Sequence, residues 1–180
     1  LDALEAAGVV VWLDGGWGVD ALLGEQTRTH ADLDIVMDRE RVDAAHAALR
    51  MLGFTLEIDE APVRQVLRDG RGGQIDIHLV VFDDEGTGWQ ALPDTDPFPY
   101  TPKGLAASGV IGGRTGRCIF VALQLAAHTG YEPDHKDWHD VALLSARFGL
   151  PPPVGYSFPW KESATGPAGA QTAPRSPGDR

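Results

Sequence analysis

Two neighbouring stretches, WLDGGWGVD at residues 12–20 and RTHADLDI at residues 28–35, decide the fold of this chain. The first runs from an apolar segment into a glycine turn, which predicts a strand, a turn and a short helix. The second predicts another strand, over residues 31–37, because acidic and apolar residues alternate in it. This order of elements indicates an α/β or α+β domain.

Asp32 and Asp34 stand two residues apart on the second predicted strand. Alternate side chains of a strand share a face, so both carboxylates point the same way, while Leu33 and Ile35 face a core. Two carboxylates so close together repel each other unless a cation lies between them. Oxygen ligands suit a hard divalent ion, most naturally Mg²⁺. The pattern therefore predicts a magnesium site, although Asp-x-Asp alone also occurs in glycosyltransferases and calcium loops.

Gly15 and Gly16 lie between an apolar strand and the start of a helix, where backbone N–H groups can bind phosphate. Arg28 and His30 precede the acidic pair, and a guanidinium fork or an imidazole nitrogen can also bind phosphate. Lys136, on a predicted helix near the end of the domain, is a further candidate for contact with a triphosphate. The simpler alternative is that these three side chains are solvated surface charges.

Asp76 is a third acidic residue of interest, on a strand predicted over residues 74–82. Apolar residues on both sides of it face the core, so Asp76 points to the opposite side of the sheet. If this strand lies beside the one with Asp32 and Asp34, three carboxylates converge, as two-metal phosphoryl transfer requires. Asp76 is then the third metal ligand and the general base that takes a proton from an acceptor hydroxyl. The alternative is a surface aspartate.

The remaining pattern predicts a small mixed, twisted sheet flanked by helices. Helices are expected over residues 1–8, 17–23, 39–52, 121–128 and 134–148, and further strands over residues 9–13, 54–58, 63–67 and 74–82, with a hairpin between residues 110 and 120. Residues 84–105 are too long for a simple connector, so we expect a functional loop. The predicted domain spans residues 1–150, with a small helical region at about 120–149, and the Pro/Gly/Ala-rich residues 151–180 are expected to be poorly ordered.

The composition excludes several classes of protein. No apolar run in the 180 residues is long enough to cross a membrane, and the first residues lack signal features. The single cysteine, Cys118, excludes an internal disulfide and a cysteine-based zinc site. The net charge of −11 argues against general binding to nucleic acid and is compatible with a cationic small substrate. We expect a cytoplasmic location, and the missing initial Met predicts a truncated N-terminus.

Together, these features resemble the nucleotidyltransferase superfamily of the DNA polymerase beta type, in which a Gly-Gly or Gly-Ser turn precedes Asp-x-Asp and a later Asp on a strand. Within it, the chain is most similar to the small antibiotic nucleotidyltransferases of the lincosamide type, with the aminoglycoside 2″-type as a relative. The resemblance covers about residues 1–150. The matching words are WLDGGWGVD at 12–20, TRTHADLDI at 27–35, IDIH at 75–78, HTGY at 128–131 and HKDWHD at 135–140.

This resemblance implies a polymerase beta-like nucleotidyltransferase fold, Mg²⁺ and ATP as co-substrate. The implied reaction transfers AMP to a drug hydroxyl and releases pyrophosphate. Two Mg²⁺ ions are expected at the site because three carboxylates are predicted to converge there. It also implies a homodimer in which the site lies near the partner chain. We add His78, Tyr131 and Trp89 as candidates for contact with the acceptor substrate.

The acceptor is the part in which such enzymes differ. We expect a lincosamide such as lincomycin or clindamycin, and the alternative is an aminoglycoside, which the acidic balance favours because those drugs are cations. A different class is an antitoxin-like nucleotidyltransferase that acts on a protein partner. A third class, a glycosyltransferase using Asp-x-Asp, leaves Asp76 and the glycine turn without a role.

Overall fold

A computed structural model describes residues 1–156 of the chain. Its helices are α1 (Asp2–Ala6), α2 (Gly15–Leu23), the 3₁₀ turn η1 (Arg39–Arg41), α3 (Val42–Arg50), α4 (Val121–Ala127) and α5 (His135–Phe148). Its strands are β1 (Val11–Leu13), β2 (Leu33–Asp38), β3 (Thr55–Glu60), β4 (Arg64–Arg68), β5 (Gln74–Phe82), β6 (Gly88–Gln90), β7 (Phe98–Tyr100), β8 (Ala107–Ile111) and β9 (Arg114–Cys118). The expectation of a poorly ordered tail over 151–180 lies mostly outside the described residues.

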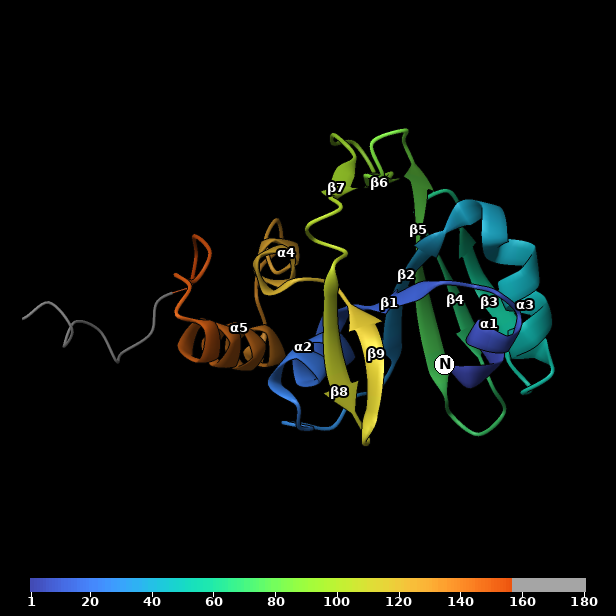
Figure 1. The fold of residues 1–180 in the computed structure, drawn as a ribbon, viewed down its shortest axis with the longest axis horizontal. Helices are drawn as coiled ribbons and strands as arrows, with labels where there is room; N and C mark the ends of the chain where they lie inside the picture. The colour runs from blue at the N-terminus through green and yellow to red at the C-terminus, as the bar shows by residue number, and fades with distance from the viewer. Residues whose placement is uncertain (157–180) are drawn as a thin grey trace, which may run out of the picture.

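The strands of residues 1–156 form one open, mixed sheet, which confirms the predicted fold class. Seven of them run in the order β3-β4-β5-β2-β1-β9-β8, and β6 and β7 extend from β5. The pairs β2/β5 and β1/β9 are parallel, and the other pairs are antiparallel. Figure 1 shows α1 and α3 at one end of the molecule and α4 and α5 at the opposite end.

Apolar clusters cover both faces of the central strands. One cluster packs against α1 and α3 and includes Leu4, Leu13, Ile35, Met37, Leu49, Ile75, Ile77 and Leu79. A second, on the other face, comprises Trp12, Val36, Val80, Tyr100 and Ile119. A third joins α2 to α4 and α5 through Val19, Val121, Leu125, Val141, Leu144 and Tyr156. Burial on both faces explains why β1 is a continuous apolar run.

Several boundaries differ from the sequence predictions. The first strand is limited to β1, and α2 begins at Gly15 rather than at residue 17, because Asp14 caps it by accepting a hydrogen bond from the Gly15 N–H at 2.7 Å. The segment 84–105, expected as a loop, contains β6 and β7, which pair with each other. No helix within residues 1–156 is long and apolar enough to span a membrane.

Candidate active site

A cavity of about 680 Å³ lies between the sheet and the two C-terminal helices. Its walls are formed by the start of α2, the loop before β2, residues of β5, β6 and β7, and the segment from α4 to α5. Nine of the residues that the sequence singled out line it: Gly15, Gly16, Arg28, His30, Asp32, Asp34, His78, Tyr131 and Lys136. Segments far apart in sequence therefore meet around one space.

Two of the three predicted carboxylates are direct neighbours across strands. Parallel pairing of β2 with β5 sets Asp34 opposite Asp76, so both side chains point to the same face of the sheet. Asp32 precedes β2, and Gln74 Nε2 lies 3.4 Å from its Oδ2. The structure thus brings the acidic residues of both stretches to one end of the β2/β5 pair.

Asp76 is nearly buried, with 6% of its surface exposed. Arg64 Nη1, from the neighbouring strand β4, donates to its Oδ2 at 2.7 Å. Its Oδ1 is buried and has no hydrogen-bond partner among the described residues. Burial raises the pKa of Asp76 above its ordinary value, and the charge of Asp34 adds to this, while His78 and Arg64 oppose it. A buried carboxylate oxygen of this kind is suited to a cation.

The donor set fits Mg²⁺ better than a softer metal, because it consists of carboxylate oxygens alone. Within residues 1–156, no three His, Cys, Asp or Glu side chains are gathered closely enough to form a complete metal site. Magnesium in nucleotide enzymes is commonly held by one or two carboxylates together with substrate phosphates. The pair Asp34 and Asp76, with Asp32 nearby, meets that requirement.

The two glycines are needed because side chains pack directly on their Cα atoms. A Cβ on Gly15 would overlap the carboxylate of Asp34, and the φ of Gly15, +52°, also disfavours other residues. A Cβ on Gly16 would overlap the imidazole of His30 and the guanidinium of Arg28. The turn therefore lies against both the acidic pair and the predicted phosphate-binding side chains.

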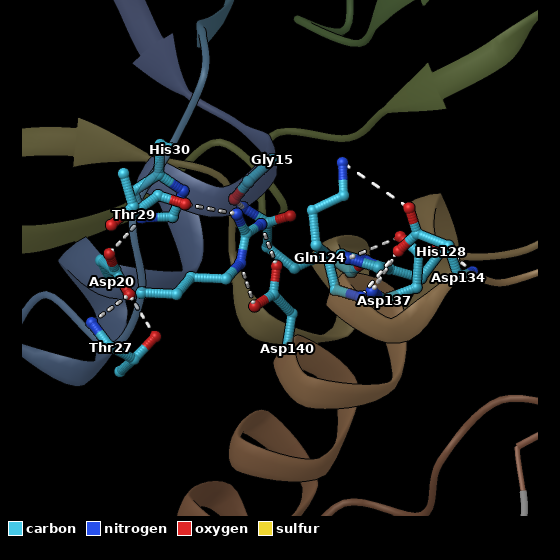
Figure 2. Close-up of polar contacts among 12 residues, drawn as sticks. Gly15, Asp20, Thr27, Thr29, His30, Gln124, His128, Asp134, Asp137 and Asp140 are labelled. Atoms are coloured by element: carbon cyan, nitrogen blue, oxygen red, sulfur yellow. Dashed lines mark hydrogen bonds and ion pairs between the residues drawn. The ribbon is translucent and has the colours of Figure 1, made fainter.

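Each of those two side chains has a carboxylate partner that the sequence did not predict. Arg28 donates to Asp140 of α5 through Nε at 2.9 Å and Nη2 at 2.6 Å. His30 is hydrogen-bonded through Nε2 to the fully buried Asp20, which also accepts from the Thr27 N–H at 3.0 Å. Figure 2 shows both groups around the start of α2 and α5. Sequence spacing gave no signal for a partner 112 residues away.

The remaining candidates differ in position. His78 Nε2 lies 3.5 Å from Asp34 Oδ1, and although burial opposes protonation, Asp34 and the other nearby carboxylates raise the pKa of His78. Tyr131 donates to Asp137 Oδ1 at 3.0 Å, and Lys136, half exposed, lies 3.6 Å from Asp134. Trp89 is not among the residues that line the cavity; its indole donates to Asp83 Oδ2 at 2.8 Å.

Sequence reasoning missed a buried polar group on the cavity wall. The Tyr100 hydroxyl lies 3.1 Å from Asp14 Oδ2 and 3.2 Å from Gln90 Oε1, and all three residues are buried. Burial raises the pKa of Asp14, and Asp34 adds to the effect. The available signal was the aromatic content of residues 84–105, which we expected to be functional.

Comparisons with known proteins agree with this geometry. A family model described as aminoglycoside-2″-adenylyltransferase matches residues 1–144. A lincosamide resistance protein of Staphylococcus haemolyticus is 33% identical over 146 residues, which are 81% of this chain and 90% of that protein. A 2″-aminoglycoside nucleotidyltransferase of Klebsiella pneumoniae is 32% identical over 123 residues, 66% of this chain and 62% of that protein.

Two solved structures share the fold along most of the chain. The lincomycin-bound crystal structure of the lincosamide antibiotic adenylyltransferase LnuA has a TM-score of 0.71 at 32% identity, covering 81% of this chain and 91% of that one. The crystal structure of ANT(2″)-Ia with adenylyl-2″-tobramycin has a TM-score of 0.64 at 25% identity, covering 82% and 84%. These matches confirm the resemblance seen in the sequence. The chain therefore belongs to the aminoglycoside-2″-adenylyltransferase family and is a nucleotidyltransferase.

Proposed function

We propose that this protein transfers AMP from ATP to a hydroxyl group of a small antibiotic, in a Mg²⁺-dependent reaction that releases pyrophosphate. The observation that carries the proposal is the parallel pairing of Asp34 with Asp76 beside the Gly15 turn. Asp34 lines the cavity, whereas Asp76 is buried next to it on β5 and is not among the lining residues. The names of the similar proteins support it: a lincosamide resistance protein, a 2″-aminoglycoside nucleotidyltransferase, and the lincosamide antibiotic adenylyltransferase LnuA.

Asp32, Asp34 and Asp76 would hold the metal, as two Mg²⁺ ions. When bound, Mg²⁺ neutralises phosphate charge and orients the α-phosphate. Asp76 accepts the proton of the acceptor hydroxyl, and its raised pKa suits a general base. The hydroxyl oxygen forms the new bond to the α-phosphorus as the bond to pyrophosphate breaks.

The phosphates bind at the start of α2. Both glycines lie in the first turn of that helix, whose N-terminus favours anions. Because the Gly15 N–H already donates to Asp14, we assign the backbone contact with phosphate to the Gly16 N–H. Arg28 and Lys136 line the same cavity and supply positive charge. His30 contributes through Nδ1, which faces Gly16, while its Nε2 stays bonded to Asp20.

We propose a lincosamide as the acceptor, contacted by His78 and Tyr131. The lincosamide resistance protein is covered over 90% of its length, and the cavity wall includes the apolar groups Leu92, Phe98, Ala126 and Ala127. The other cavity carboxylates already have partners: Asp14 with the Gly15 N–H, Asp137 with Tyr131, and Asp140 with Arg28. A drug with several ammonium groups would find few unpaired carboxylates here.

An aminoglycoside is the second candidate acceptor. The description of the matching family and the net charge of −11 favour it, because a cationic drug is attracted by an acidic protein. Both acceptors use the same nucleotide chemistry, so the choice between them depends on the acceptor side of the cavity.

Mass spectrometry of a panel of lincosamides and aminoglycosides, incubated with ATP and Mg²⁺, tests both proposals. We expect lincomycin and clindamycin to gain one AMP group with stoichiometric release of pyrophosphate. Modification of aminoglycosides alone would reassign the acceptor. Transfer of label from ATP to a protein, with no drug modified, would instead support the antitoxin-like alternative.

Three further proposals come from the sequence: the dimer from the resemblance, the location from the cysteine content, and the third from the net charge of −11. We propose that the protein is a cytoplasmic homodimer that does not bind nucleic acid. Light scattering after gel filtration measures the oligomeric state, and a mass of one 19.3 kDa chain would contradict the dimer. Fluorescence anisotropy with labelled DNA and RNA tests the third point.

A further inference from the structure

We propose that Asp140 is a positioning residue, which holds the Arg28 guanidinium in place for the phosphates of the nucleotide. The inference rests on the proposed function, in which Arg28 contacts a triphosphate. It adds a residue of α5 to the nucleotide site and explains why a carboxylate lies on the wall of a cavity that binds an anion.

The contact between the two side chains is bidentate. Nε and Nη2 of Arg28 donate to the two carboxylate oxygens of Asp140, at 2.9 and 2.6 Å. The side chain of Asp140 is 2% exposed and that of Arg28 is 21% exposed. Two parallel charge-assisted hydrogen bonds in a nearly dry setting fix the plane of the guanidinium. In Figure 2, Asp140 projects from α5 toward this contact.

The pairing leaves part of the guanidinium available. Asp140 occupies Nε and one hydrogen of Nη2, while the nearest acceptor of Nη1 is the Thr29 carbonyl at the long distance of 3.4 Å. Nη2 lies 2.5 Å from where a Cβ of Gly16 would stand. The available N–H groups are therefore beside the turn that we propose binds the phosphates.

Alone, Arg28 would be a poor phosphate ligand. Its long side chain leaves a loop rather than a helix or strand, and an unrestrained arginine loses conformational entropy when it binds. Asp140 holds the side chain in one conformation before the nucleotide arrives. The same helix carries Lys136 one turn earlier, so α5 presents one cation and fixes another.

A double-mutant cycle separates positioning from a merely structural link. We expect Asp140→Asn to raise the Kd of a non-hydrolysable ATP analogue with Mg²⁺, and the KM for ATP, about tenfold, with a smaller change in kcat. In an Arg28→Gln background, the same Asp140→Asn change is expected to alter Kd by less than about twofold, because Asp140 acts through Arg28. Calorimetry measures Kd, and thermal unfolding is recorded for every variant.

Glu57→Gln is the matched control, because it breaks the Arg68–Glu57 ion pair of 2.6 Å on the β3–β4 hairpin, whose residues do not line the cavity. We expect it to leave Kd unchanged. If Asp140→Asn does not fold, Asp140→Glu replaces it as the test variant. This substitution keeps the charge but displaces the carboxylate from the bidentate contact with Arg28, and we expect a smaller loss of affinity than the one expected for Asp140→Asn.

An unchanged Kd in Asp140→Asn, or an equal loss in both backgrounds, would overturn the positioning role. A lower melting temperature with unchanged Kd has the same meaning. Failure of the wild-type protein to bind the analogue would instead overturn the proposed function itself.

Discussion

At the scale of single residues, each of several functional side chains of the site is held in place by a polar or charged partner. Arg28 is held by Asp140, His30 by Asp20, and Asp76 by Arg64. Such pairs cost desolvation energy and contribute little net stability, so their value lies in fixing the geometry of side chains. The acidic pair Asp34 and Asp76 is different, because two side chains of the same kind lie side by side on neighbouring strands.

The base assignment can be tested by removing one carboxylate. We expect Asp76→Asn to lower kcat by about 10³-fold, because an amide cannot accept the hydroxyl proton and is a weaker ligand for Mg²⁺. The amide oxygen can still accept from Arg64, so the variant is expected to fold. Steady-state release of pyrophosphate measures the effect.

Glu60→Gln is the control for this variant, because it removes the other partner of Arg64, at 2.7 Å, and leaves Asp76 intact. We expect nearly full activity from it. An active Asp76→Asn enzyme would show that Asp76 is not the base.

The glycine turn makes a second prediction at this scale. Gly15→Ala places a Cβ against the Asp34 carboxylate and should greatly weaken Mg²⁺-dependent activity. Gly24→Ala is the matched control: Gly24 also has a positive φ, of +81°, but no atom of residues 1–156 lies within 4 Å of the position that its Cβ would take. Both variants carry about 1–2 kcal/mol of left-handed strain, so this strain by itself cannot account for a difference between their activities. Equal activity losses would rule out steric displacement of Asp34 as the cause.

At the scale of elements, local patterns predicted those strands and helices whose burial is regular. Alternation in β5 separated Asp76 from Ile75 and Ile77, and the αL glycine at residue 149 ends α5 as expected. The strands β6 and β7 could not be predicted, because three residues have no measurable period and form only by pairing with β5 and each other.

Dependence on tertiary pairing also explains why the position of Trp89 and the partners of Arg28 and His30 could not be predicted. Within β6, Gly88 and Gln90 are buried, so Trp89 points outward and is 42% exposed. The orientation of Trp89 depends on the edge of β5 with which β6 pairs, and local sequence does not encode that edge. The partners of Arg28 and His30 depend in the same way on tertiary packing. The acidic residues could be predicted because their alternation with apolar residues places them on one face of a strand.

The turn between β5 and β6 allows a test of element stability. Asp83 accepts from the Trp89 indole and from the N–H groups of Glu85 and Thr87, and these hydrogen bonds lower its pKa. A carboxylate with a lowered pKa stabilises the folded state above its unfolded pKa, about 3.9, and loses that contribution as the pH falls through the lower folded value. We therefore expect Asp83→Asn to be destabilised at pH 7 and to approach the wild type as the pH falls below about 4. Urea unfolding across pH 3–7 measures the difference, and a constant difference would contradict the assignment.

At the scale of the whole molecule, the cavity lies where the sheet meets the C-terminal helices, so ligands there bridge the two parts. Val19 of α2 packs with Val141 and Leu144 of α5, and all three are fully buried. The helix that begins at the glycine turn is thus joined to the helix that carries Lys136 and Asp140. A ligand that binds the folded state but not the unfolded state raises the free energy of unfolding.

This linkage makes a prediction about the metal-free protein. Burial raises the pKa of Asp76 and of Asp14, and in both cases the charge of Asp34 adds to the effect. A carboxyl group whose pKa is raised on folding lowers the stability of the folded state at pH values above its unfolded pKa, so both groups cost stability at pH 7, and removal of the Asp34 charge should relieve part of that cost. We expect Asp34→Asn, whose amide can keep the contact with His78, to raise the melting temperature in EDTA by roughly 2–8 °C.

The wild type is expected to gain stability when Mg²⁺ and ATP are added, whereas Asp34→Asn loses most of that gain together with its activity. Differential scanning calorimetry with and without Mg²⁺ gives both numbers. Two outcomes would show that the carboxylates at this edge of the sheet do not bind the metal. The wild-type melting temperature could stay unchanged when Mg²⁺ and ATP are added, or that of Asp34→Asn could rise as much as that of the wild type.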